Sequence, residues 1–168
     1  MSGGEPAVAL RPAREDDRDF FARVYASTRT EELAVVPWSD EQRSAFLAQQ
    51  FAAQTADYAA NYADASFDVV LVDGEPAGRL IVYRRLDEIH IVDIALLPEW
   101  RGRGIGTRLL EALQEEAKTA GKPLGIHVEV DNPARSLYDR LGFRQVEERG
   151  LYLLMRWVPE VENPRDGG

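Results

Sequence analysis

Residues 101–108 hold three glycines and three arginines, a combination suited to binding an anion. Because glycine has no side chain, backbone N–H groups can approach a ligand closely at Gly102, Gly104 and Gly106. A helix predicted to begin here adds the partial positive charge of its N-terminus. Arg101 and Arg103 place full charges beside the loop. The pattern predicts a phosphate-binding loop, and the competing interpretation is a glycine-rich turn with solvated arginines.

Two other phosphate-binding loops fit this stretch less well. A Walker loop requires a Gly-Lys pair followed by a hydroxyl residue, and the stretch contains no lysine. A nicotinamide fingerprint requires G-x-G-x-x-G, but counting from Gly102 the third glycine position is Thr107. The strands predicted before the loop also look antiparallel rather than doubly wound. A nucleotide-binding module stays open as the weaker alternative.

The elements that position this loop follow from the hydrophobic pattern. The run 89–97 is too apolar for an edge strand and ends at Pro98, which predicts a central strand leading into the loop. A helix over 106–120 is predicted from one apolar face, formed by Leu109, Leu110, Leu113 and Ala117. The pattern predicts further strands at 8–10, 67–72, 78–83, 123–130, 143–146 and 151–158, and further helices over 15–29, from Ser39 onward and after Asn132. The expected fold is mixed α/β, with a central, mostly antiparallel mixed sheet of about six to seven strands flanked by about four helices.

Length and composition limit the class of protein. The chain has 168 residues, a formal charge of -9 and no cysteine. This length predicts a single domain, expected at 7–158 between flexible tails at 1–6 and 159–168. The absence of cysteine excludes disulfides and thiolate chemistry and agrees with a reducing cytosol. Without a signal peptide, a membrane span or a basic surface, we expect a cytoplasmic protein with no membrane or nucleic-acid partner.

Two stretches resemble the GNAT superfamily of N-acetyltransferases. The run 94–110 is similar to its acyl-CoA motif, whose signature of Gln or Arg, two residues, Gly, one residue and Gly or Ala is met by Arg101, Gly104 and Gly106. The run 132–143 looks like its motif near the C-terminus, with Asn132 and Tyr138 one position closer than in the commoner spacing. The close resemblance covers residues 89–143.

The resemblance implies that acetyl-CoA binds as the acyl donor and that no metal takes part. The central strand would splay from its neighbour and pair with the pantetheine arm through its main chain, while its side chains pack in the core. The pyrophosphate would lie on the N–H groups of the loop. The implied contacts are Ile94, Ala95, Leu96, Arg101, Gly102, Arg103, Gly104, Ile105, Gly106, Thr107, Asn132, Arg135 and Tyr138. For Asn132, a helix N-cap is the competing role.

The resemblance also implies direct acetyl transfer to a primary amine. Tyr138 matches the tyrosine that protonates the departing thiolate, and the Leu96 main-chain N–H would stabilise the oxyanion. An amine with a pKa of about 10.4 must first lose a proton. Glu129 and His127 lie two apart on one predicted strand, share a face and are candidate bases, with a water chain as the alternative. Further acidic and imidazole groups lie around the preceding strand at Glu88, His90 and Asp93.

The acceptor is the least defined part of the expected activity. In this family the first two helices and their connection usually build the acceptor pocket, which implies residues 29–38 and candidate contacts Glu31, Glu32 and Trp38. Acidic residues there would suit a cationic amine of a small molecule or a peptide, but a solvated helix end is the simpler interpretation of these charges. A non-catalytic acyl-CoA sensor on the same scaffold is the alternative function. Apolar alternation in the last strand suggests a homodimer.

Overall fold

The computed structural model describes residues 5–160. The predicted domain 7–158 falls within this range, whereas the outer parts of both predicted tails, 1–4 and 161–168, lie outside the described residues. The described chain divides into two compact units. The first unit contains the residues up to Tyr83 together with Asp93–Ile105, and the second contains Arg84–Val92 and the residues from Gly106 onward.

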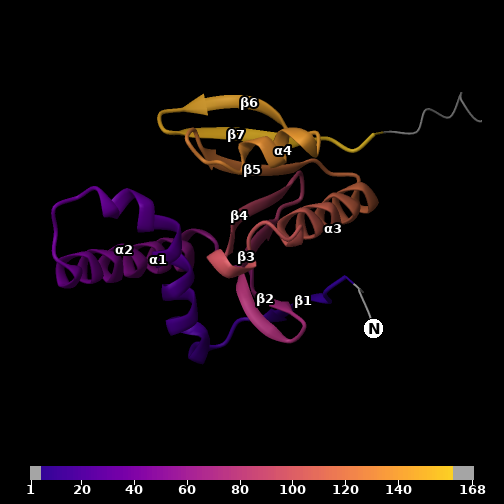
Figure 1. The fold of residues 1–168 in the computed structure, drawn as a ribbon. Coiled ribbons are helices and arrows are strands. Elements are labelled where there is room, and N and C mark those ends of the chain that lie inside the picture. Colours follow the sequence, from indigo (N-terminus) through magenta and orange to yellow (C-terminus); the bar gives the residue numbers. More distant parts are fainter. Residues whose placement is uncertain (1–4, 161–168) are drawn as a thin grey trace, which may run out of the picture. The chain divides into compact units, whose positions relative to one another are not determined.

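Seven strands, four α-helices and two 3₁₀-helices follow one another along the described chain. In order they are β1 (Val8–Pro12), η1 (Glu15–Asp17), α1 (Arg18–Ala34), α2 (Asp40–Asn61), β2 (Ser66–Val72), β3 (Glu75–Arg84), β4 (Ile89–Leu96), η2 (Pro98–Trp100), α3 (Ile105–Ala120), β5 (Leu124–Glu129), α4 (Arg135–Arg140), β6 (Arg144–Arg149) and β7 (Tyr152–Trp157) (Figure 1). This confirms the predicted mixed fold, with shifted bounds for some elements. The first helix, for example, continues to Ala34 rather than ending near Arg29.

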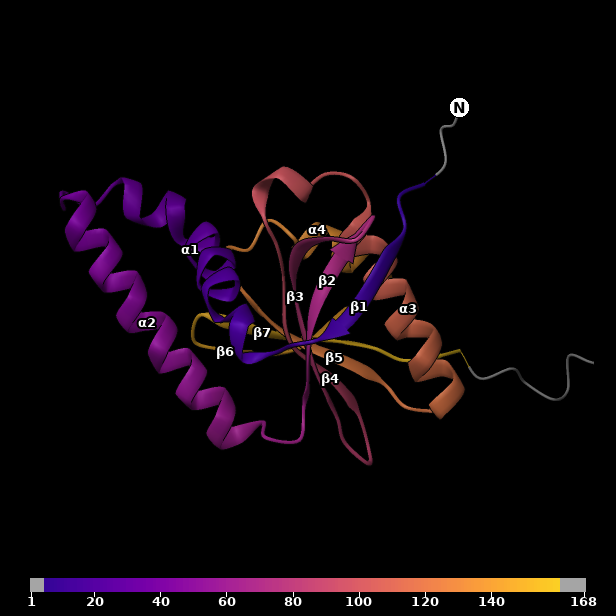
Figure 2. The same cartoon turned by 90° about the horizontal axis from the view of Figure 1, so that it is seen from below.

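The strands hydrogen-bond in the order β1-β2-β3-β4-β5-β7-β6, and β4 contributes to both units. In the first unit β1 pairs with β2, and β2 with β3, in antiparallel fashion, as Figure 2 shows by the three strands running side by side. In the second unit residues 89–91 of β4 pair in parallel with 124–126 of β5. There β5 pairs with β7, and β7 with β6, antiparallel. The prediction that 89–97 forms a central strand is therefore confirmed.

In the first unit, α1 and α2 lie next to each other and pack an aromatic core (Figure 2). The α2 helix begins at the predicted capping box: the Gln42 N–H donates to Ser39 Oγ at 3.1 Å, and the Ser39 N–H donates to Gln42 Oε1 at 2.8 Å. The ring centroids of Tyr25 and Phe51 are 6.0 Å apart. Both belong to a buried cluster that also contains Phe21 and Val69.

In the second unit, α3 and β5 each bury one face. The four predicted apolar residues of α3 are all buried, namely Leu109, Leu110, Leu113 and Ala117. On β5 the buried Ile126 and Val128 alternate with His127 and Glu129, which therefore lie together on the opposite face. The sequence interpretation placed the two candidate bases on one face, and the strand alternation agrees.

Candidate active site

The end of β4 lies unusually close to β3 within the first unit. The Leu97 N–H donates to the Ala77 carbonyl at 2.8 Å. A Cβ atom added to Gly78 would lie 2.1 Å from the carbonyl oxygen of Ala95, far inside any real contact. A glycine is therefore required at position 78 for the two strands to keep this spacing.

The predicted main-chain contacts of the acyl donor lie on this part of β4. Ile94, Ala95 and Leu96 are half-buried, and only Leu97 is fully buried. The expectation that these side chains pack in the core is thus met by Leu97 and only partly by the other three. Only residues 89–91 of β4 pair with β5, so residues 94–96 take no part in that ladder.

The glycine-rich loop connects η2 to α3 as predicted. Residues 101–104 are exposed, and Gly102 and Gly104 have φ angles of +73° and +78°, a conformation that favours glycine. Ile105 is buried, so only its main chain can reach a ligand. The helix then continues through Gly106 and Thr107, both half-buried. The loop therefore offers exposed backbone at the N-terminus of a 16-residue helix.

Arg101 has partners inside the protein. Its Nε donates to the Leu96 carbonyl at 2.9 Å, and its Nη2 donates to Ser27 Oγ at 3.3 Å. Arg103 instead lies with its guanidinium 5.2 Å from the centre of the Trp100 ring. Arg101 therefore ties the end of β4 to α1, a role that its predicted function as a phosphate contact did not include. The sequence holds no local signal for it, because Ser27 lies 74 positions away.

Asn132 and Arg135 both stabilise the turn between β5 and α4. Asn132 Oδ1 accepts the N–H of Ala134 at 2.9 Å, and Arg135 Nη1 donates to the Val130 carbonyl at 2.8 Å. The helix begins at Arg135 rather than at Pro133, so Asn132 caps the preceding turn and the predicted helix start was two residues early. These side-chain contacts are structural, but the competing prediction of a helix N-cap at Asn132 is wrong, because Ala134 is the N-cap residue and no side chain caps the helix.

Tyr138 lies in α4 and is 4% exposed. Its ring meets that of Phe143 edge to face, with centroids 5.8 Å apart, and the Phe143 N–H donates to the Tyr138 carbonyl at 3.0 Å. Packing in the second unit therefore holds the ring in one orientation.

A pair of histidines joins β4 and β5 in the second unit. His127 Nδ1 lies 3.2 Å from His90 Nε2, and the rings are T-shaped. Beyond His90, the Glu88 carboxylate lies 3.7 Å from Nδ1 and accepts Arg156 Nε at 3.0 Å. Burial, with the His127 charge second, lowers the pKa of His90 to about 4, and burial followed by Arg149 lowers the pKa of His127. Both imidazoles are therefore neutral near pH 7.

The remaining residue of the predicted acidic and imidazole set, Asp93, lies in the first unit. It accepts a hydrogen bond from Arg79 Nη2, which also donates to Gln54 Oε1 at 2.9 Å. Burial and then the charge of Asp93 raise the pKa of Tyr58 well above its ordinary value. Sequence reasoning missed this network, although one signal was present: Arg79 is a charged residue inside the apolar run 78–83.

The predicted acceptor region is mostly helical. Glu31 and Glu32 lie within α1, where Glu32 pairs with Arg29 at 3.1 Å, and both carboxylates are exposed. Trp38 lies between the helices with its ring 5.2 Å from that of Phe46. A small cavity of about 210 Å³ opens between α1 and α2 and includes Arg29, Glu32 and Phe46 in its lining. Of the three predicted contacts, only Glu32 reaches this cavity.

Two further features concern metals and membranes. Within residues 5–160, the structure contains no group of three or more His, Asp and Glu side chains that could hold a metal ion. Among the helices of the same residues, none combines the length and apolar character required to cross a membrane.

Comparison with known proteins finds acetyltransferases in sequence and in structure. An N-alpha-acetyltransferase of Sulfurisphaera tokodaii is 33% identical over 99 residues, 50% of this chain and 59% of that protein. A putative ribosomal protein bS18-alanine N-acetyltransferase of Bacillus subtilis is 28% identical over 160 residues, 90% of this chain and 95% of that protein. The chain spans about half the length of most curated relatives that it matches.

The comparison of folds and a family profile also find acetyltransferases. The crystal structure of the PaiA N-acetyltransferase from Thermoplasma acidophilum in complex with coenzyme A has a TM-score of 0.69 and 17% identity, covering 90% of this chain and 99% of that one. At this identity the likeness shows the fold alone. The profile described as "Acetyltransferase (GNAT) family" matches residues 21–143, which include both sequence motifs. Because this match extends over most of the chain, the protein belongs to the GNAT family of acetyltransferases.

Proposed function

We propose that this protein is an N-acetyltransferase that moves an acetyl group from acetyl-CoA directly to a primary amine. The observation that carries the proposal is the exposed glycine-rich loop between β4 and α3. Its positive-φ glycines and the helix N-terminus would present N–H groups to the pyrophosphate, with Arg103 adding charge. The outer edge of β4 would pair with the pantetheine arm as an added strand does.

The chemistry assigns a separate task to each proposed residue. The amine nitrogen attacks the acetyl carbonyl carbon, and the C–N bond forms as the C–S bond breaks. The Leu96 main-chain N–H would stabilise the negative charge on the carbonyl oxygen. Tyr138 would give its proton to the departing thiolate. A base would take the proton that the amine loses, and solvent would carry that proton back to the Tyr138 oxygen.

For the base, the histidine pair favours His127 over Glu129. If His90 Nδ1 carries the hydrogen that faces Glu88, then His90 Nε2 is an acceptor and His127 donates to it from Nδ1. In that arrangement His127 Nε2 keeps a free lone pair and can take a proton. The lowered pKa of His127 supports the same role, because a neutral imidazole is required at physiological pH. Glu88 and His90 would then be positioning residues.

For the acceptor, the activities for which the relatives are named favour the α-amine at a protein N-terminus. Two of them are named as N-alpha-acetyltransferase and as ribosomal protein bS18-alanine N-acetyltransferase. Glu31 and Glu32 near the end of α1 are the proposed contacts for a cationic amine. A peptide with a free N-terminal alanine should be acetylated, whereas the same peptide with a blocked N-terminus and an internal lysine should not.

Calorimetric titration with acetyl-CoA tests the binding step. The parent protein should bind acetyl-CoA and should bind neither NAD nor ATP comparably. Gly104→Glu should abolish binding, because it adds a negative charge where the pyrophosphate would lie. Gly121→Glu is the matched control: Gly121 also has a positive φ with open space around it, but it follows the other end of α3. Equal binding by the Gly104→Glu variant would contradict the proposal.

Thiol release during turnover tests the catalytic step and separates an enzyme from a sensor. Tyr138→Phe should keep acetyl-CoA binding but lower kcat about a hundred-fold or more, as loss of a general acid does. His127→Ala should remove the acidic limb of the pH–rate profile, whereas Glu129→Gln should leave that limb unchanged. Acetyl-CoA binding without thiol release for any amine tested would favour the sensor.

Two properties of the whole molecule remain predictions. The apolar alternation of β7 predicts a homodimer, and a monomer mass in light scattering would contradict it. The absence of cysteine predicts a cytoplasmic location, which cell fractionation of the native protein checks.

A further inference from the structure

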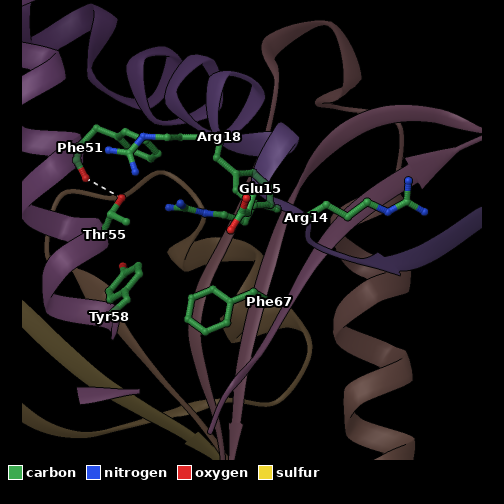
Figure 3. A pocket seen from close by; sticks show the side chains of 9 residues that line it. Arg14, Glu15, Arg18, Phe51, Thr55, Tyr58 and Phe67 are labelled. Atoms are coloured by element: carbon green, nitrogen blue, oxygen red, sulfur yellow. Dashed lines mark hydrogen bonds between the residues drawn. The ribbon is translucent and has the colours of Figure 1, made fainter. Parts of the chain in front are cut away.

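The first unit contains a cavity of about 430 Å³ that none of the proposed catalytic residues lines. It lies between the start of α1, the second half of α2, and strands β2 and β3 (Figure 3). Four aromatic residues contribute to its wall, namely Phe21, Phe51, Tyr58 and Phe67. The volume falls in the range of small-molecule sites, roughly 300–1,000 Å³. The predicted acceptor region, 29–38, lies at the other ends of the two helices.

Groups of opposite charge face this aromatic cavity. Figure 3 shows the Glu15 carboxylate directed toward the space that Tyr58 and Phe67 border. Within residues 5–160 that carboxylate makes no hydrogen bond or ion pair. Across from it, the Arg18 guanidinium lies 5.8 Å from the centre of the Phe51 ring, with no carboxylate partner among the described residues. Arg14 also borders the cavity, but its side chain extends away from these rings (Figure 3).

A buried donor in the same wall lacks an acceptor. Arg79 is 5% exposed, and its guanidinium lies 5.5 Å from the Phe21 ring centre and 5.9 Å from that of Tyr58. Asp93 and Gln54 accept from its Nη2, but its buried Nε has no hydrogen-bond partner. Leaving such a donor unsatisfied costs about 1–3 kcal/mol.

These features select the charge type of the ligand. A simple anion would be repelled by the Glu15 carboxylate, and a simple cation would be repelled by Arg18, whereas the charge of Arg79 is already paired with Asp93. A molecule with both charges satisfies each group, and an apolar substituent would cover the aromatic wall. We propose that this cavity is a binding site for a free α-amino acid with an apolar side chain. Its ammonium group lies at Glu15, its carboxylate at Arg18 and Arg79, and its side chain against the phenylalanine rings. The proposal does not depend on acetyl transfer.

Calorimetric titration of the full chain with L-phenylalanine tests this site. The parent protein should bind L-phenylalanine. Phenethylamine lacks the carboxylate and N-acetyl-L-phenylalanine lacks the ammonium, so both should bind at least about ten-fold more weakly, the loss expected for one charged hydrogen bond. Glu15→Gln and Arg18→Gln should each weaken L-phenylalanine binding by a similar factor. Both residues are exposed, so neither variant should disturb folding.

Matched controls separate a local contact from a change in net charge. Asp16→Asn and Arg14→Gln alter the charge by the same amounts as Glu15→Gln and Arg18→Gln. Asp16 does not line the cavity and the Arg14 side chain extends away from it, so both controls should bind L-phenylalanine like the parent. The proposal fails if L-phenylalanine does not bind at millimolar concentrations. It also fails if Glu15→Gln and Arg18→Gln leave binding unchanged, or if either single-charge analogue binds as well as the amino acid.

Discussion

Replacing Gly78 by alanine should separate β3 from the end of β4. The added Cβ would lie 2.1 Å from the Ala95 carbonyl oxygen, 2.9 Å from Leu96 Cδ2 and 3.0 Å from Leu96 Cα. Because ordinary contacts begin at 3.4 Å, the Ala95 carbonyl would have to move by about 1.3 Å. The obstacle is backbone on a paired strand, so a side-chain rotation cannot relieve it.

The expected loss of stability combines two effects. Overpacking of this kind costs about 1–3 kcal/mol, and weakening the nearby bond from the Leu97 N–H to Ala77 adds about 1 kcal/mol. Together they predict a loss of about 3 kcal/mol, which for a chain of this size lowers Tm by about 6–12 °C. Acetyl-CoA affinity should fall as well, because the displaced residues form the proposed pantetheine edge.

Thermal and urea unfolding, followed by circular dichroism, measure this effect. Gly106→Ala is the control for stability. Its Cβ would meet only Leu137 Cδ2, at 3.8 Å, and in the first turn of α3 it should change stability by no more than about 1 kcal/mol. If Gly78→Ala melts within about 2 °C of the parent, the close approach of β3 to β4 is not a constraint and the reasoning is refuted.

Three further predictions concern single contacts. Arg101→Gln removes the hydrogen bonds to Leu96 and Ser27, so it should lower stability by about 1 kcal/mol and weaken acetyl-CoA binding; Arg103→Gln should affect binding alone. The folded-state pKa of His90, lowered to about 4, lies below its ordinary value, so the neutral form contributes stability above pH 6.5 that is lost as the pH falls toward 4. Urea unfolding at pH 7 and at pH 4.5 measures this effect. Between the two pH values, the free energy of unfolding should fall by up to about 3 kcal/mol more in the parent than in His90→Gln, and an equal fall in both proteins would contradict the lowered pKa. Ser39→Ala should cost about 1 kcal/mol through loss of the α2 cap, and an unchanged urea midpoint would exclude that contribution.

The sequence by itself determined the parts of this protein that depend on neighbouring residues. The capping box at Ser39, the apolar face of α3 and the glycine-rich loop were all predicted from spacing within one or two helical turns. The loop predicted an anion-binding site, and the family was indicated by the resemblance of residues 94–110 and 132–143 to its motifs. The start of α4 was predicted two residues early, because Asn132 caps a turn before the helix and both arrangements use the same residue type.

Only the tertiary structure decided which distant side chains meet. Glu88, His90 and Asp93 look like one group in the sequence, yet Glu88 and His90 join His127 in the second unit while Asp93 joins Arg79 in the first. Strand alternation predicts the face on which each residue lies but not the register or the neighbouring strand. Pairing of β4 with β5 brings His90 to His127, 37 positions away, and burial lowers the pKa of His90 to about 4. Such contacts depend on how strands pair across the sheet, and the spacing of residues within one strand does not determine that pairing.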